Sequence, residues 1–255
     1  PLPGVFGAAV PRGNFASLKT IGWDLTFNWK DKISESLSYG IGVVLSDSKA
    51  WITKYNNPNG IIPYGANIST YYKGERLGEI WGFQNDGYYT AASLAAPHPD
   101  QSYIVVSNSN IYLPGDIRFK DLNGDNKINI GKGTLLDHGD LKVIGNSQPR
   151  YNFGLNTNIS WKSLSLSAFF QGVGHQDWWP GTEAGLFWGQ YNRPYESIPS
   201  DMMQNVWTEE NPNAYFPRYR GYVALQGTRE LALPQVNYLQ NVAYIRLKKV
   251  DLTWS

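Results

Sequence analysis

The sequence predicts an all-β fold in which antiparallel strands form part of a large membrane-spanning barrel with long extracellular loops. Three observations support this prediction. Two hairpins alternate between apolar and polar residues, Trp-Lys pairs end their first strands, and the connections alternate between very short and very long. Alternation with a period of two residues gives a sheet two chemically different faces. A barrel in a bilayer needs such faces, because lipid surrounds its outside and its lumen is polar.

The first predicted hairpin joins residues 22–30 to residues 36–46 through a short link at about residues 31–34. Each strand has roughly the 9–11 residues that a tilted membrane β-strand requires. Opposite its apolar residues, the second strand begins with serine and glycine, which suit a crowded interior better than a solvated surface. The apolar face of this hairpin comprises Trp23, Leu25, Phe27, Trp29, Leu37, Tyr39, Ile41, Val43 and Leu45.

The second predicted hairpin repeats this design over residues 151–161 and 164–173, with a turn at Lys162-Ser163. Its polar face consists of asparagine, glycine and serine, without the charged residues that usually keep a solvent-facing sheet soluble. Trp161 stands beside Lys162, as Trp29 stands beside Lys30, and such pairs anchor strands at lipid headgroups. The apolar face, interrupted by Thr157, comprises Tyr151, Phe153, Leu155, Ile159, Trp161, Leu164, Leu166, Ala168 and Phe170.

The spacing of the connections is typical of outer-membrane barrels, which have short periplasmic turns and long extracellular loops. Long segments run over about residues 47–149 and 174–241. After the second, apolar residues flank Lys248-Lys249, which we interpret as another short turn. If the turns at about 31–34, 162–163 and 248–249 are periplasmic, both long segments are extracellular. Residues 1–255 then form part of one barrel domain.

The composition excludes several kinds of protein and of site. The 22 basic residues nearly balance the 21 acidic residues, so there is no electrostatic case for nucleic-acid binding. The absence of cysteine excludes a disulfide framework and a thiolate metal site. The sequence has no run of about 18 apolar residues, which a transmembrane helix would need. Known enzyme motifs are missing, and His98, His138 and His175 lack metal-ligating partners at a useful spacing, so we expect no catalysis.

Several long stretches resemble, in order, those of SusC/RagA-like TonB-dependent outer-membrane transporters. These stretches span most of residues 78–255, and residues 2–29, LPGVFGAAVPRGNFASLKTIGWDLTFNW, resemble the strands just upstream in that family. The similarity is specific because the matching stretches are long. They read LGEIWGFQNDGYY, GDIRFKDLNGDNKIN, GDLKVIGNSQPRYNFGLN, LSAFFQGVG and YLQNVAYIRLKKVDLTWS.

The resemblance implies a barrel of about 22 strands in the bacterial outer membrane, with an N-terminal plug inside it. Such a transporter imports oligosaccharides or peptides with energy from the TonB complex, and a SusD-like surface lipoprotein closes over it as a lid. The sequence shows no plug, no TonB-contacting box and no earlier barrel strands, and the family normally continues beyond the position of Ser255. We therefore expect a C-terminal part of the barrel that lacks the final strands and that does not transport alone, because its strand edges would be unpaired in lipid.

The stretch DLNGDNKIN, residues 121–129, resembles the start of a calcium loop, in which flexible oxygen ligands alternate along the chain. Gly124 permits a sharp turn. Lys132 stands where a bidentate acid is expected, so Asp116, Asp137 or Asp140 would have to substitute. The alternative is a turn whose side chains bond to their own backbone. The candidate Ca²⁺ ligands are Asp121, Asn123, Asp125, the carbonyl group of Lys127, and Asn129.

The second long segment concentrates aromatic residues. Exposed rings stack on sugar faces or apolar side chains and are common anchors at interfaces. They could equally pack the loop against itself or against the lid, and self-packing is the favoured interpretation of Trp188. Arg218 or Arg220 could bind a carboxylate, although the pattern favours a surface role. The predicted substrate or partner contacts are Trp178, Trp179, Phe187, Trp188, Tyr191 and Tyr195.

A second interpretation comes from a different class of protein. A soluble β-rich glycan-binding module with a calcium-stabilised loop would also show alternating strands. Detergent dependence separates the two, because a barrel with a lipid-facing surface does not stay monodisperse in plain buffer.

Overall fold

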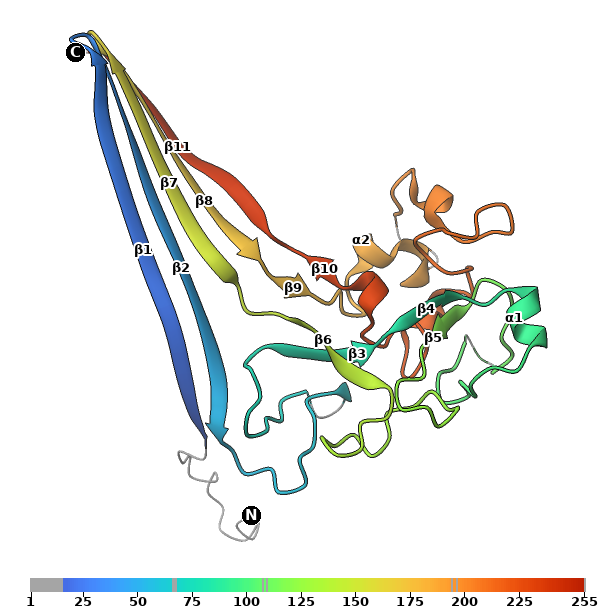
Figure 1. Ribbon diagram of the computed structural model, residues 1–255. Helices are drawn as coiled ribbons and strands as arrows, with labels where there is room; N and C mark the ends of the chain where they lie inside the picture. Colours follow the sequence, from blue (N-terminus) through green and yellow to red (C-terminus); the bar gives the residue numbers. More distant parts are fainter. Residues whose placement is uncertain are drawn as a thin grey trace, which may run out of the picture.

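Five long strands form one antiparallel sheet, and the rest of the chain forms a loop body at one end of it (Figure 1). The computed structural model describes residues 16–65, 68–106, 108, 110–193, 195 and 197–254. Residues 2–15 of the stretch 2–29, which resembles the upstream strands of the family, therefore lie outside the described residues. The long strands are β1 (Ser17–Ser34), β2 (Leu37–Lys54), β7 (Arg150–Trp161), β8 (Leu164–His175) and β11 (Tyr244–Trp254).

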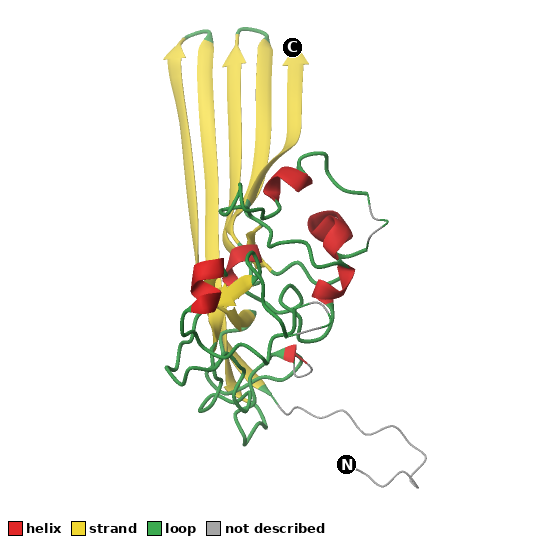
Figure 2. Cartoon of the chain, turned by 90° about the vertical axis from the view of Figure 1, so that its right-hand side faces the viewer, coloured by secondary structure: helices red, strands yellow, loops and turns green. Residues whose placement is uncertain are grey.

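The order of strands in the sheet is β1-β2-β7-β8-β11, so each long strand pairs with the next long strand along the chain. Both predicted hairpins are present, and the two long segments simply connect neighbouring strands of the same sheet. The β1–β2 turn, the β7–β8 turn and the C-terminal end lie together at the end far from the loop body (Figures 1 and 2).

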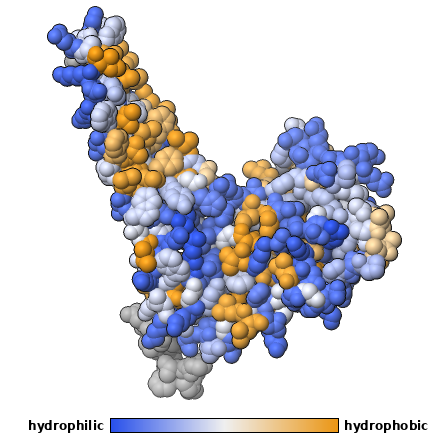
Figure 3. Space-filling view, in the orientation of Figure 1, coloured by the Kyte–Doolittle hydropathy of each residue, from blue (hydrophilic) through white to orange (hydrophobic). Residues whose placement is uncertain are grey.

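The apolar residues of the five strands align into rows across one face of the sheet, interrupted only by Thr157 and Asp31 in the rows given below. In β1, Leu25 and Phe27 are 55% and 52% exposed, so they are not buried between two stacked sheets, as a β-sandwich would require. Figure 3 shows apolar side chains gathered over the upper part of the sheet. Four rows run Phe27–Val43–Leu155–Phe170–Leu247, Trp29–Ile41–Thr157–Ala168–Val250, Asp31–Tyr39–Ile159–Leu166–Leu252 and, from β2 onward, Leu37–Trp161–Leu164–Trp254.

The structure confirms one predicted turn and corrects two others. Lys162 and Ser163 form the β7–β8 turn, in which Lys162 has a φ of 53°. The first turn lies at residues 35–36, because β1 continues through residues 31–34 and Ser34 pairs with Leu37. Residues 248–249 are not a turn. They lie within β11 beside a bulge between Leu247 and Lys249, which places one extra residue in the strand without ending it.

The predicted end of the first long segment at residue 149 agrees with the structure, whereas the predicted starts of both segments and the end of the second are corrected. β2 continues to Lys54 and β8 to His175, so the strands extend further toward the loop body than the hydrophobic pattern indicated. The segments outside the sheet are residues 55–149 and 176–243, called here the first and second long loops.

The loop body consists of short elements joined by loops (Figure 2). Its strands are β3 (Glu79–Phe83), β4 (Asn85–Tyr88), β5 (Ile117–Phe119), β6 (Leu141–Asn146), β9 (Asp177–Trp178) and β10 (Gln240–Asn241). Its helices are α1 (Ala91–Ala95) and α2 (Gly185–Trp188), with 3₁₀ turns η3 (Gly189–Tyr191), η4 (Met202–Asn205), η5 (Tyr222–Leu225) and η6 (Val236–Tyr238).

Both long loops supply the core of the loop body. Ile104 and Leu141 of the first loop belong to the same buried cluster as Trp188 and Leu231 of the second. Because a structureless loop of such length is unusual in a compact domain, this shared core explains how the segments stay ordered. Among the described residues, no helix is both long and apolar enough to cross a bilayer.

Candidate functional site

The polar face of the sheet is crowded, as predicted for the side opposite the apolar rows. A Cβ atom on Gly42 would lie 2.8 Å from Oδ1 of Asn28, and one on Gly40 would collide with Oδ1 of Asn158. These glycines therefore let side chains of the neighbouring strands lie flat across β2.

A buried ion pair lies at the end of the sheet that meets the loop body. The Arg150 guanidinium donates through Nε and a terminal nitrogen to both carboxylate oxygens of Asp47, and both side chains are at most 10% exposed. The pair lies just beyond the last register pair of β2 and β7, Ser46 and Asn152. Bidentate geometry fixes the direction in which β7 leaves the loop body.

The predicted aromatic residues of the second loop come together, with one exception. Phe187 lies between Trp178 and Trp188, with ring centroids 6.4 Å and 4.7 Å away, in edge-on geometry. Trp179 contacts Trp188 at 6.0 Å. Tyr195 is the exception: it is 78% exposed and makes no ring contact with another aromatic residue of the described part of the chain.

Burial agrees with the self-packing interpretation favoured for Trp188, and it gives Tyr191 the same packing role in place of a contact role. Both side chains are 0% exposed, so they pack the core of the loop body and reach no substrate or partner in this structure. The Trp188 indole donates to the carbonyl oxygens of Pro180 and Gly181 at 3.2 and 3.0 Å, and the Tyr191 hydroxyl donates to the carbonyl oxygen of Pro217 at 2.5 Å. Trp178, at 43% exposed, and Tyr195 remain available for contacts.

The predicted calcium loop is closed by its own hydrogen bonds. Asp121 accepts from the backbone N–H groups of Gly124 and Asn126 at 2.6 and 2.8 Å. The side chain of Asn123 accepts from the N–H of Asp125, and that of Asp125 accepts from the N–H of Lys127. These are Asx turns, as the alternative interpretation expected.

The other features of the loop match a calcium site only in part. Asn126, at the sixth position, has a φ of 61°, the left-handed conformation that a calcium loop requires there. Asn129 Oδ1 accepts from the N–H of Gly131 at 2.6 Å. The buried Asp140 accepts from the N–H groups of Leu122 and Asn129 at 2.7 and 2.9 Å. The described residues hold no group of three or more acidic or histidine side chains arranged for a metal. Calcium binding therefore stays a prediction.

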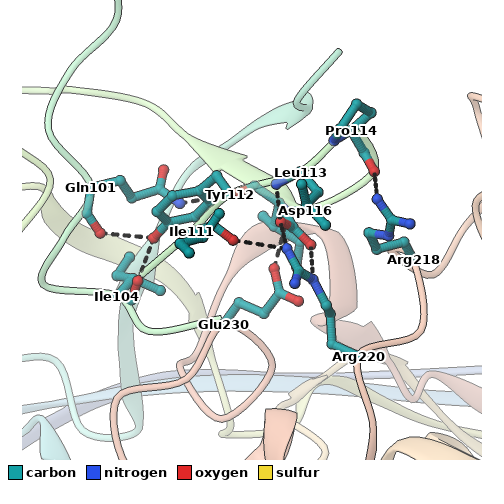
Figure 4. A network of polar contacts seen from close by, with 11 residues as sticks. Gln101, Ile104, Ile111, Tyr112, Leu113, Pro114, Asp116, Arg218, Arg220 and Glu230 are labelled. Carbon is teal, nitrogen blue, oxygen red and sulfur yellow. Dashed lines mark hydrogen bonds and ion pairs between the residues drawn. The ribbon is translucent and has the colours of Figure 1, made fainter. Parts of the chain in front are cut away.

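A partly buried polar network joins the two long loops (Figure 4). The Arg220 guanidinium from the second loop donates to both carboxylate oxygens of Asp116 in the first, at 2.9 and 2.5 Å. It also donates to the carbonyl oxygen of Ile111 at 2.9 Å. Arg220 thus recognises a carboxylate of its own chain, and the surface role that its sequence context favoured is wrong. Arg218 similarly donates to the carbonyl oxygen of Pro114 at 2.9 Å.

Glu230 completes the link between the loops from a fully buried position. Its Oε2 accepts from the N–H of Ile117 at 3.0 Å, and its Oε1 has no hydrogen-bond partner among the described residues. Burial, and secondarily the charge of Asp116, raises the pKa of Glu230 to about 8. The carboxyl is therefore mostly protonated at neutral pH, which removes the cost of a buried unpaired charge.

Sequence reasoning missed Asp116, Glu230 and the Asp47–Arg150 pair as linking residues. The paired groups lie 103 or more residues apart, and no local spacing reports such contacts.

Comparison with known proteins finds similar proteins over almost the whole chain. No protein-family model matches the chain. It is 21% identical over 262 residues to TonB-dependent receptor P3, and 23% identical over 250 residues to TonB-dependent receptor P26, both of Formosa agariphila (strain DSM 15362 / KCTC 12365 / LMG 23005 / KMM 3901 / M-2Alg 35-1). These alignments cover 100% and 95% of this chain but only 23% and 22% of the two receptors.

Solved structures show the same relation. The chain aligns over its full length with 25% of a chain of the RagAB peptide importer in the closed-closed state, with a TM-score of 0.61 and 16% identity. A second structure, of the RagAB peptide transporter, aligns with a TM-score of 0.58 and 16% identity over 24% of that chain. The chain therefore spans about a quarter of the length of the proteins that it matches, and the resemblance predicted from its sequence is confirmed: it is similar throughout to part of a SusC/RagA-like TonB-dependent receptor.

Proposed function

We propose that the protein acts in TonB-dependent uptake of oligosaccharides or peptides across the bacterial outer membrane, together with a SusD-like surface lipoprotein. The observation that carries this proposal is the sheet with exposed apolar rows on one face and glycine, serine and asparagine on the other. In a closed barrel of about 22 strands, the first face contacts lipid and the second lines the lumen. The similarity to TonB-dependent receptors supports this assignment.

The two faces and the loop body would divide the work of transport. The lumen face would surround a plug that the TonB complex moves, and the loop body would hold substrate at the extracellular end. The Asp116–Arg220 ion pair supports this division, because it holds the two long loops as one unit that can present a fixed surface. No covalent chemistry is needed at any step.

The lipoprotein partner is proposed from the similarity to RagAB and from exposed aromatic rings. Trp178 and Tyr195 are 43% and 78% exposed on the second loop, where a lid could bury them. Calcium in the Asp121–Asn129 loop is part of the proposal, supported by the left-handed Asn126.

Uptake in living cells tests the proposed function. A strain that lacks the full-length transporter should lose uptake of its oligosaccharide or peptide substrate, and should regain it with the wild-type gene only when TonB is intact. Uptake that persists without TonB would contradict the mechanism. Purified protein that is monodisperse without detergent or partner chains would instead support the soluble glycan-binding alternative.

A further inference from the structure

A groove of about 910 Å³ opens between the two long loops, and none of the aromatic residues that the sequence singled out lines it. The end of β4, Thr90 and Arg118 form its first-loop side, and residues 204–215 with Asn237 form its second-loop side. Ligand sites in proteins typically have volumes of about 300–1,000 Å³. The groove is thus large enough to hold several linked residues of a polymer.

Hydrogen bonds between the loops fix the groove. The Tyr88 hydroxyl lies within hydrogen-bonding distance of the carbonyl oxygens of Ala214 and Tyr215, at 3.0 and 2.8 Å. On the same side, the N–H of Asn237 donates to Oδ1 of Asn85 at 3.0 Å. The walls therefore come from segments more than a hundred residues apart, yet they need no ligand to hold them together.

One aromatic ring in the groove is both exposed and immobilised. Tyr215 is 40% exposed, and its ring packs edge-on against Phe216 at 4.9 Å and Tyr238 at 5.3 Å between centroids. Its hydroxyl accepts a hydrogen bond from the Gln240 amide at 2.9 Å. A ring held in this way can stack on a ligand without losing rotational freedom on binding.

The remaining polar groups of the groove are mostly neutral amides. Within the described part of the chain, the exposed side chains of Gln204, Asn213 and Asn237 make no hydrogen bond. The charged lining residues, Asp86 and Arg118, pair with each other at 2.9 Å. Amides donate and accept at once, as sugar hydroxyls do, whereas a charged ligand would find no unpaired charge of opposite sign.

We propose that this groove binds a neutral oligosaccharide, with Tyr215 stacking on a sugar ring and Gln204, Asn213 and Asn237 bonding to its hydroxyl groups. The inference rests on the proposed uptake function, since it names the substrate class and one place where substrate is held.

The test uses the full-length transporter in detergent, with neutral hexasaccharides of glucose, xylose and mannose and a matched set of hexapeptides as probes. We expect at least one hexasaccharide to bind, and Tyr215→Ala to weaken binding about tenfold through loss of stacking. The double variant Asn213→Ala, Asn237→Ala should weaken it similarly, since each truncation removes one hydrogen-bonding amide. Tyr222→Ala removes a comparably exposed ring outside the groove and should leave affinity unchanged.

Binding of peptides in place of saccharides, failure of every saccharide to bind, or equal affinity of the groove variants and the wild type would overturn the inference. Uptake measured in the same strains separates it from the proposed function. If the groove assignment is wrong but the transporter assignment is right, TonB-dependent uptake persists at wild-type level in the Tyr215→Ala strain. If the transporter assignment itself is wrong, the wild-type strain shows no TonB-dependent uptake.

Discussion

Phe27→Arg should destabilise the inserted barrel, whereas Asn28→Arg should be tolerated. Phe27 lies seven residues (34 minus 27) from Ser34, the turn end of β1. At roughly 3.3 Å per residue and a tilt of about 45°, its depth from the turn end is about 16 Å. An apolar band is about 25 Å tall, so Phe27 lies near its middle, where an arginine on the lipid face costs about 2–4 kcal/mol.

The neighbouring Asn28 is the matched control, because it is on the opposite face and its partner Gly42 carries no side chain. An arginine there would face the polar lumen and should cost less than about 1 kcal/mol. The assay is urea-induced unfolding of the full-length transporter in lipid vesicles, which gives the free energy of unfolding of each variant. Equal losses in both variants, or a larger loss for Asn28→Arg, would refute the assignment of faces.

Three further predictions concern the loop body. Glu230→Gln should remove a pH dependence of local stability. In the wild type, the folded-state pKa of Glu230, about 8, exceeds its unfolded value. The stabilisation is therefore complete below about pH 4.5 and is lost as the pH rises through 8, by up to about 1.4 kcal/mol per pH unit. Exchange of the Ile117 amide hydrogen reports it, and identical pH profiles in both proteins would refute the reasoning. Trp188→Ala should destabilise the loop body by about 3–5 kcal/mol, because it leaves a cavity beneath fully buried rings; unchanged protease resistance of the loops would contradict this. Calcium titration by calorimetry should give heat with the wild type and none with Asp121→Ala or Asp125→Ala, whereas equal heats in all three would remove the metal site.

The sequence predicted the strands in which apolar and polar residues alternate with a period of two. Alternation located β7 and β8 closely, and the two-residue turn at Lys162-Ser163 is correct. It failed where a local signal was ambiguous. The lysines at 248–249 look like a turn, but a bulge accommodates them within a strand, and the charged residues at 31–34 continue β1 beyond its apolar part.

The loop body could not be predicted, because contacts over long sequence separations determine it. Tyr191 looks like a binding residue in a polar, aromatic-rich loop, but it belongs to the same buried cluster as Phe216 and Leu231. Glu230 likewise carries no local signal, since its partner Ile117 is 113 residues away. The groove beside Tyr215 exists only because segments of both loops meet there.

The most direct test of the account is a scan of lipid contact along β1. These 255 residues contain no cysteine, so single cysteines at residues 24–29 of the full-length transporter, with any cysteine elsewhere replaced by serine, can each carry a spin label without background. In vesicles, the rate at which the spin label collides with dissolved oxygen should be high at positions 25, 27 and 29, which share a face with Trp23, and low at positions 24, 26 and 28. Collision with a water-soluble nickel reagent should show the reverse order. Uniform collision rates along the strand, or high nickel access at 25, 27 and 29, would show that this face meets water and would contradict the transporter assignment.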